Sequence, residues 1–335
     1  MKKVITFIFL FIAISSIAQQ AQIARVSSTG VTTIYTDLKQ AIWNSQDDDI
    51  IYLPGATFSA DSIGIKKRIH LIGTGHYPDS TLASGLTHLS TNIWFLSGST
   101  GASVQGLKTN NVYVADLINS TISMLKCNLT GIVGYGGYDV INCTFNIKES
   151  VFQSVDGRGA MKYNIEKCFI LSNSIGDGTG NAYSLYALEN STVKYCIFPS
   201  NGINLIFNST IISNNIFYGP IGGGANLSSF YYNLFTTSTS VTTSFGGNNI
   251  EYGNVAEGTF NNTFINVTAA GFNYSFDYHL KNTSVGQIVP GGVGVYAASN
   301  PYNPNPYNPH IYFKQIDPAT NAQGQLKINA KVKAQ

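Results

Sequence analysis

The stretch NIFYGPIGGGANLSSFYYNLF, residues 215–235, contains the same short pattern twice. Asn215-Ile216-Phe217 and Asn233-Leu234-Phe235 each place a small polar residue before two apolar ones, with starts 18 residues apart. Looser copies precede them, with starts 19 to 28 residues apart, at Cys143-Thr144-Phe145, Cys168-Phe169-Ile170 and Cys196-Ile197-Phe198. A repeat of uneven length predicts a solenoid with one coil per repeat, because loops between strands can change length without disturbing the stack.

Stacked coils would bring equivalent side chains of neighbouring coils about 4.7–4.9 Å apart. We therefore expect the first residues of the repeats to form one ladder at a coil corner, where Asn tolerates the left-handed conformation: Cys143, Cys168, Cys196, Asn215, Asn233 and Asn249. At that spacing the Cβ atoms lie farther apart than a disulfide prefers. The four cysteines are therefore predicted to be buried free thiols, with disulfides as the alternative that export would permit.

The composition favours a folded chain that is held together by hydrogen-bonding groups rather than ions. Only 11% of the 335 residues are charged, whereas 44% are hydrophobic and 12% aromatic. The charged fraction of an average protein is about 25%. The net charge of +2 implies no polyanionic partner, and no basic stripe interleaved with aromatics indicates nucleic acid.

The N-terminus predicts export. Lys2-Lys3 is followed by an apolar run from Val4 to Ile14 and by Ser16-Ile17-Ala18, a small-x-small cleavage site. This order is typical of a secretory signal peptide over residues 1–18. A membrane anchor is the alternative, but the run is short for a span of about 20 residues. We expect a bacterial protein that is secreted or lies on the outer cell surface, without a transmembrane segment after signal removal.

Several segments resemble the pectin-lyase-like superfamily of right-handed parallel β-helices. Asp37–Ile42 (DLKQAI) with Asp48–Gly55, Ile69–Gly75 (IHLIGTG) and Gly101–Leu107 (GASVQGL) are similar to its opening coils. Phe276–Leu280 with Ser284 is similar to the closing segment of β-helix proteins exported by Gram-negative bacteria, although Val285 stands where a Pro is usual. The resemblance implies an all-β, single-stranded right-handed parallel β-helix over residues 19–300, with a short N-terminal capping helix.

Residues 301–335 differ from the repeats in amino-acid composition. A linker rich in Pro, Asn and Tyr is followed by Leu326, Ile328, Ala330 and Val332, which alternate with three lysines and an asparagine. Period-2 alternation predicts a half-buried C-terminal strand with a lysine-protected face. We expect this tail strand to cover the open end of the solenoid, with a sorting or attachment tail as the alternative.

Catalytic chemistry has weak support in the sequence. The resemblance implies lyases that hold Ca²⁺ with clustered carboxylates and use Arg or Lys as base, or hydrolases with paired carboxylates, and neither constellation is visible. Asp156, Arg158 and Lys162 are the candidate catalytic residues, with solvated loop charges as the alternative. The histidines show no metal-ligand spacing. We predict no metal and no cofactor, Ca²⁺ entering only if the protein is a lyase.

Tyrosines are the candidate ligand-binding residues. Tyr135, Tyr138, Tyr183 and Tyr186 lie in loop-like segments of the central coils, where exposed rings could stack on sugars. Packing at coil corners is the alternative. We therefore expect a monomeric, non-catalytic surface protein that recognises polysaccharide or a cell-envelope glycan, or that has a structural role. A polysaccharide lyase or glycoside hydrolase with a divergent site is one alternative, and an adhesin or assembly component with a protein partner is another.

Overall fold

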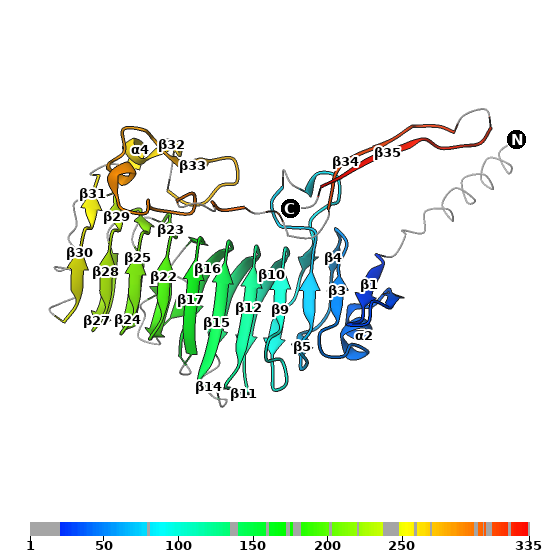
Figure 1. Cartoon of the computed structure of the whole chain (residues 1–335), viewed down its shortest axis with the longest axis horizontal. Coiled ribbons are helices and arrows are strands. Elements are labelled where there is room, and N and C mark those ends of the chain that lie inside the picture. The colour runs from blue at the N-terminus through cyan, green and yellow to red at the C-terminus, as the bar shows by residue number, and fades with distance from the viewer. Residues whose placement is uncertain are drawn as a thin grey trace, which may run out of the picture.

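The structure is a computed structural model, and it describes residues 21–333 apart from 79–80, 135–139, 159–160, 172–174, 177–181, 201–202, 220, 237–247, 258–259, 269, 298–300, 304, 306–309 and 321–322. The chain forms an elongated right-handed parallel β-helix of about nine turns (Figure 1). The predicted all-β solenoid is therefore confirmed.

One long sheet, called sheet A, runs the whole length of the solenoid. Its strands in spatial order are β2 (Thr32–Tyr35), β1 (Ile23–Val26), β3 (Ile50–Tyr52), β6 (His70–Ile72), β9 (Ser103–Gln105), β12 (Thr121–Leu125), β15 (Cys143–Lys148), β17 (Met161–Glu166), β22 (Thr192–Lys194), β25 (Ile211–Ser213), β28 (Ser229–Tyr231) and β30 (Ile250–Tyr252). From β3 onward the strands are parallel, whereas β1 is antiparallel to both of its neighbours.

The second sheet, sheet B, has two arms that share the long strands β10 (Lys108–Val114), β13 (Asn128–Gly134) and β16 (Val151–Asp156). Arm B1 adds β4 (Thr57–Phe58), β7 (His88–Leu89), β18 (Phe169–Ile170), β23 (Ile197–Phe198), β26 (Ile216–Phe217), β29 (Leu234–Phe235) and β31 (Val255–Ala256). Arm B2 adds β5 (Ile63–Ile65), β8 (Ile93–Phe95), β21 (Leu185–Glu189), β24 (Ile203–Asn208) and β27 (Ile221–Asn226). Each coil therefore passes from sheet A to arm B1 and then to arm B2.

Smaller elements decorate the solenoid. The pairs are β11 (Leu117–Ile118) with β14 (Val140–Ile141), β19 (Ile175–Gly176) with β20 (Ala182–Tyr183), β32 (Phe264–Asn266) with β33 (Asp277–Leu280), and β34 (His310–Ile316) with β35 (Ile328–Lys333). The helical elements are α2 (Leu38–Trp43), α4 (Phe260–Thr263) and the 3₁₀ turn η2 (Val285–Ile288). In α2 the Asp37 side chain accepts the backbone N–H of Gln40, and Leu38, Ala41 and Ile42 are buried. This is the predicted capping helix.

The interior is filled by ladders of apolar side chains. In sheet A one register row consists of fully buried residues, namely Ile51, Leu71, Val104, Met124, Ile147, Ile165, Val193, Ile212 and Phe230. The next position in that row is Glu251. A carboxylate at an inward position disfavours the addition of another strand, so the apolar ladder ends at the last coil.

The predicted asparagine ladder exists at the corner between sheet A and arm B1. Asn215 donates through its backbone N–H and its Nδ2 to Oδ1 of Asn233, each across 3.0 Å. Asn233 bonds Asn254 in the same way, at 2.9 and 3.0 Å. The prediction of Asn249 as the next member was wrong, because Asn249 accepts from the Ser228 N–H at the other corner, where arm B2 leads into sheet A.

Cys143 also belongs to that other corner, as the first residue of β15, whereas Cys127, Cys168 and Cys196 follow sheet A strands. The error has a simple origin, since a small polar residue before an apolar pair occurs at both corners of the coil. All four cysteines are buried free thiols, as predicted.

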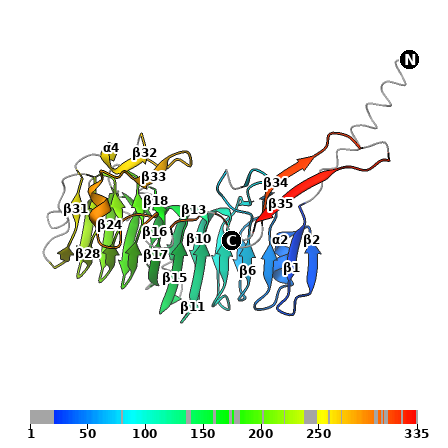
Figure 2. The same ribbon diagram turned by 45° about the horizontal axis from the view of Figure 1, so that its top comes forward.

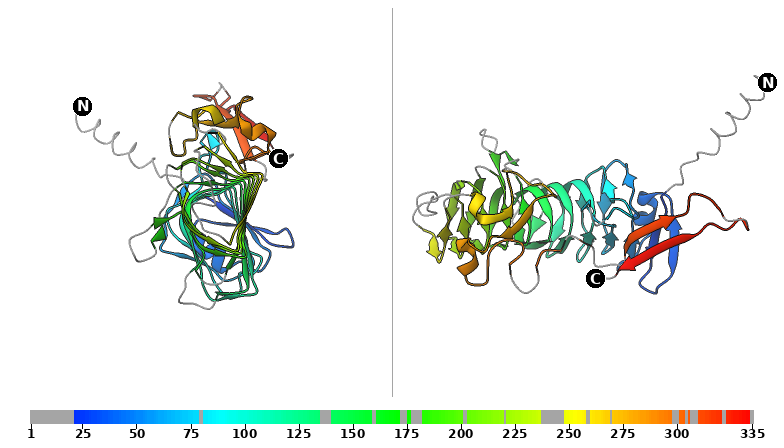
Figure 3. Two further views of the ribbon diagram at one scale, coloured as in Figure 1. Left: turned by 90° about the vertical axis from the view of Figure 1, so that its left-hand side faces the viewer. Right: turned by 90° about the horizontal axis from the view of Figure 1, so that it is seen from above.

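The C-terminal segment folds back over the outer face of arm B1 (Figure 3). Outward side chains of this arm pack against apolar residues of the segment: Val151, Phe169, Ile197, Ile216 and Leu234 meet Phe264, Val267, Tyr278, Val289, Val293, Val295 and Tyr302. Arm B1 is thereby buried on both faces from β16 to β29. Sheet A and arm B2 keep their outer faces, and Lys108 on β10 of arm B1 is exposed.

The prediction of a half-buried tail strand was wrong in its burial. The strand β35 pairs with β34 as a separate hairpin that projects beyond the solenoid (Figures 1 and 2). Ile328 and Val332 are each 60% exposed. The hairpin pairs with no strand of sheet A or sheet B among the described residues, and it does not cover the solenoid end. The period-2 alternation of apolar and polar residues thus distinguishes the two faces of a hairpin, and neither face packs on the core of the solenoid through a side chain that the structure describes.

Candidate functional site

The central coils of sheet A carry a row of polar side chains on the outer face. Period-2 alternation in β15 and β17 turns Asn146 and Asn164 outward, and Thr192 of β22 continues the row. Nδ2 of Asn164 donates to Oδ1 of Asn146 across 2.9 Å, and the Thr192 hydroxyl donates to Oδ1 of Asn164 across 3.1 Å. These bonds hold the amides in one orientation along the solenoid axis.

A row of charges lies beside the amides on the same strands. Glu166 of β17 stands between Lys148 of β15 and Lys194 of β22, with N–O distances of 3.8 and 3.9 Å. Lys167 approaches the same carboxylate at 3.8 Å. Two partly exposed ammonium groups and one buried one therefore surround a single carboxylate.

The two rows line a hollow of 350 Å³ whose walls are formed by Leu125, Asn146, Ile147, Lys148, Asn164, Glu166, Thr192 and Lys194. A second hollow of 220 Å³ lies at the beginning of β15 and β17, lined by Asn142, Cys143, Thr144, Met161, Lys162, Glu189 and Asn190. We call the two hollows together the polar trough. Its exposed donors and acceptors match the hydrogen-bonding groups of sugars, and it offers cations for acidic ones.

The structure places Lys162 on a different sheet from Asp156, which pairs with Arg158. Lys162 is exposed on β17 of sheet A, in the second hollow of the polar trough. Asp156 ends β16 in sheet B, and Arg158 follows it. Nε of Arg158 lies 2.9 Å from both carboxylate oxygens of Asp156, and Nη2 lies 2.5 Å from Oδ2. Lys162 takes no part in these Arg158–Asp156 contacts, because Asp156 lies on β16 of sheet B and Lys162 on β17 of sheet A.

Two of the candidate tyrosines join the Arg158 cluster instead. The guanidinium carbon of Arg158 lies 5.2 Å from the centre of the Tyr186 ring. The Tyr183 and Tyr186 rings lie 4.9 Å apart with an interplanar angle of 42°. Tyr183 is only 7% exposed, so it supports Tyr186 rather than offering a free ring face. Tyr135 and Tyr138 lie outside the described residues.

Sequence reasoning missed most of the polar trough and one aromatic pair. The trough had a signal, because CTFNIK (143–148) and MKYNIE (161–166) both place polar residues at alternate positions of a strand. Trp94 and Tyr113 lie opposite one another on β8 and β10 and stack with centres 4.4 Å apart. Their pairing depends on the register of two coils 19 residues apart, which no short motif reveals.

No metal centre is evident among the described residues, since none of their His, Cys, Asp and Glu side chains gather in groups of three or more. Within the same part of the chain, no helix has the length and apolar character needed to cross a membrane. Comparisons with protein-family models, curated proteins and solved structures found no match to this chain. Functional inference therefore depends on the geometry of the surface.

Proposed function

We propose that this protein is a non-catalytic surface β-helix that recognises a polysaccharide along the polar trough of sheet A. The observation that carries the proposal is the pair of outward rows, Asn146–Asn164–Thr192 and Lys148–Glu166–Lys194, on three consecutive strands. Both rows repeat once per coil, at about 4.8 Å. A surface with regularly spaced donors, acceptors and cations suits an extended polymer that presents hydroxyl and carboxylate groups along its length.

The charge of the polar trough favours acidic glycans. Lys148, Lys162 and Lys194 exceed the two carboxylates of the trough, Glu166 and Glu189, by one positive charge. A uronate can exchange with Glu166 as the partner of Lys148 or Lys194, because these exposed ion pairs are long and contribute little stability. Neutral polymers would keep the hydrogen bonds to the amide row but lose this exchange.

The positions of the carboxylates in the polar trough favour binding of a glycan without cleavage. Hydrolysis of a glycosidic bond by the usual route needs two carboxyl groups that flank the bond, one as acid and one as base or nucleophile. Glu166 lies among three lysines, and Glu189 lines the other hollow of the trough. Arg158, which could serve a lyase, is engaged with Asp156 on the other sheet.

Export by residues 1–18, location on the cell surface and membership of the pectin-lyase-like superfamily are parts of the same proposal. They are supported by the N-terminal sequence, by the opening-coil motifs and by the β-helix fold. A glycan-binding protein of this fold would act where extracellular or envelope polysaccharides are present.

Affinity electrophoresis of the purified protein through gels containing polygalacturonate, alginate or a neutral glucan tests the proposal. We expect retardation by an acidic polymer, weakened by Lys148→Ala/Lys194→Ala and by Asn146→Ala/Asn164→Ala. Asn111→Ala is the matched control, because it removes a half-buried amide from β10 of sheet B. Equal mobility in all gels, or equal loss in the control, would contradict recognition by the trough.

The same polymers decide whether the protein also cleaves. Release of 4,5-unsaturated uronate is followed by ultraviolet absorbance, with and without Ca²⁺. We expect no product. Turnover that disappears in Lys162→Ala or Arg158→Ala would establish a lyase and overturn the non-catalytic assignment.

A further inference from the structure

A further hollow lies at the N-terminal end of the solenoid and is separate from the polar trough. It has a volume of 640 Å³, within the usual range of ligand sites. Its walls come from α2 on one side and from β5 and the following turn on the other: Lys39, Ile42, Trp43, Ser62, Ile63, Gly64, Lys66, Lys67 and Ile69. We call this hollow the cap cleft.

One wall of the cap cleft is an open strand edge. The strand β5 pairs only with β8, and no strand of the described chain lies on its other side. The Ile63 N–H donates to the Asn92 carbonyl, and the Ile65 carbonyl accepts from Leu96. Because successive residues of a strand direct their backbone groups to opposite sides, the N–H and C=O of Gly64 point away from β8. Gly64 also lines the cleft, so these groups face it.

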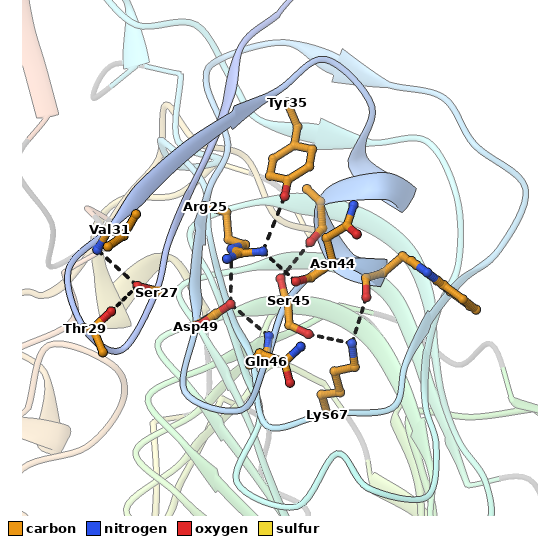
Figure 4. Close-up of polar contacts among 12 residues, drawn as sticks. Arg25, Ser27, Thr29, Val31, Tyr35, Asn44, Ser45, Gln46, Asp49 and Lys67 are labelled. Carbon is orange, nitrogen blue, oxygen red and sulfur yellow. Dashed lines mark hydrogen bonds and ion pairs between the residues drawn. The ribbon is translucent and has the colours of Figure 1, made fainter.

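The opposite wall is held rigidly by the polar contacts of the cap (Figure 4). The Lys67 ammonium donates to the carbonyls of Trp43 and Ser45, across 2.8 and 2.5 Å. Arg25 pairs with the buried Asp49 at 3.2 Å and donates to the Asn44 carbonyl. These contacts fix the end of α2 at a set distance from β5. The shape of the cap cleft is therefore fixed by these contacts, because they hold α2 in place.

The floor of the cap cleft is apolar and its rim is basic. Ile42, Ile63 and Ile69 are at most 9% exposed, whereas Trp43 is 82% exposed at the mouth. Lys39, Lys66 and Lys67 surround these residues. Lys39 pairs with Asp61 at 3.3 Å, and for Lys66 no ion pair is formed within the described chain. An occupant needs main-chain hydrogen bonds, some apolar side chains and negative charge.

A second copy of the chain meets these needs poorly. Its projecting hairpin β34–β35 carries Lys314, Lys327, Lys331 and Lys333 against the single acidic residue Asp317, so it would be repelled by the lysine rim. Lysines along an open edge are a common device against self-association. The lysines at the rim of the cap cleft attract an acidic strand instead.

We propose that the cap cleft binds an extended acidic peptide segment of a partner protein, which adds as a strand to the open edge of β5. Main-chain bonds to Gly64 supply affinity, as in other cases of strand addition, and alternate side chains enter the Ile42–Ile63–Ile69 floor. Acidic residues of the peptide pair with Lys39 and Lys66.

Binding of short fluorescent peptides to the full chain tests the proposal. The probes are a peptide of alternating Glu and Val, its counterpart of alternating Lys and Val, and the Glu–Val peptide with N-methylated backbone amides. In a Trp94→Phe background the only tryptophan is Trp43, so its emission reports occupancy of the cleft. We expect the Glu–Val peptide to bind and to shift the Trp43 emission, and both other probes to bind about tenfold more weakly.

Gly64→Pro and Gly64→Ala form the matched pair. Proline removes the outward N–H but leaves the bonds of Ile63 and Ile65 to β8, and an edge strand accepts it at such a position. Alanine keeps the N–H, and its Cβ would meet only Leu96 Cδ1, at 3.4 Å. We expect about tenfold weaker binding for Gly64→Pro, since one hydrogen bond is lost, and unchanged binding for Gly64→Ala.

Lys66→Glu provides a test that does not depend on the backbone, and it should weaken the Glu–Val peptide and strengthen the Lys–Val peptide. Failure of every peptide to bind would overturn the proposal. So would equal binding to Gly64→Pro and Gly64→Ala, or binding of dodecanoate in preference to any peptide, which would make the cleft an amphiphile site. None of these results depends on whether the polar trough binds glycans.

Discussion

The Tyr274 hydroxyl and Nδ1 of His76 form a hydrogen bond across 2.9 Å, although 198 residues separate the two in the chain. Nδ2 of Asn128 donates to the same hydroxyl oxygen across 2.6 Å. Tyr77 adds a bond to the Tyr274 carbonyl at 3.0 Å. The segment that covers arm B1 is thus fastened to the loop that follows β6.

The His76 contact makes stability depend on pH. Burial lowers the pKa of His76 to about 3, whereas an unfolded histidine has a value of about 6.5. The unfolded chain therefore binds a proton that the folded chain does not, and stability is lost as pH falls below about 6.5. We expect the free energy of unfolding to fall by up to about 1.4 kcal/mol per pH unit there, measured by urea titration at several pH values.

In the His76→Gln variant, the decrease in the free energy of unfolding that His76 causes below pH about 6.5 should disappear. Tyr274→Phe should keep it, because burial rather than the hydrogen bond causes the shift. An identical slope in wild type and His76→Gln would rule out His76 as the source.

A buried ion pair fastens the same segment farther along the corner. Lys126 and Glu149, with side chains 1% and 2% exposed, lie 3.1 Å apart, and the Lys126 ammonium also donates to the Asn305 carbonyl across 2.7 Å. Burial lowers the pKa of Lys126, and Glu149 opposes that shift. We expect Lys126→Met or Glu149→Gln to cost about 3–5 kcal/mol, since each leaves a buried charge unpaired. In a double-mutant cycle the double variant should lose less than both single losses together, and simple additivity would refute the coupling.

The asparagine ladder should be sensitive to a single substitution. Asn233 is fully buried and bonds Asn215, Asn254 and the Ile212 carbonyl. Asn233→Ala leaves several of these groups without a partner, at about 1–3 kcal/mol for each. The exposed Asn248 makes only a long bond of 3.3 Å to Asn226, so Asn248→Ala should have little effect. Chemical denaturation of the two variants compares them directly, and equal stability would contradict a role for the ladder.

The thiols should be inert in the folded protein. Burial raises the pKa of Cys127 to about 12, and burial together with the neighbouring Cys196 thiol raises that of Cys168 well above its ordinary value. The reactive thiolate is therefore scarce. We expect no reaction with an aromatic disulfide reagent at neutral pH, and reaction of all four cysteines in denaturant. Fewer than four thiols in the unfolded chain would indicate disulfides.

The sequence predicted local features well and pairwise placement poorly. The cap helix after Asp37 and the Asn215–Asn233 contact follow from short motifs and from the spacing of one coil. Asn249 was assigned to the wrong corner because both corners begin with a small polar residue. Arg158 and Lys162 are four positions apart in sequence, but Arg158 follows β16 of sheet B and Lys162 lies on β17 of sheet A. The trough residues Asn146 and Asn164 required the register between coils.

The sequence alone determined that the chain stacks short strands into a solenoid, because each coil must bury a few apolar side chains and turn at a small polar residue. Only the tertiary structure decided which surfaces stay open. The C-terminal segment covers arm B1 from β16 to β29 and leaves sheet A and the edge of β5 uncovered. These placements come from contacts such as that of His76 with Tyr274, and the free energy of contacts between distant segments has no signature in local periodicity.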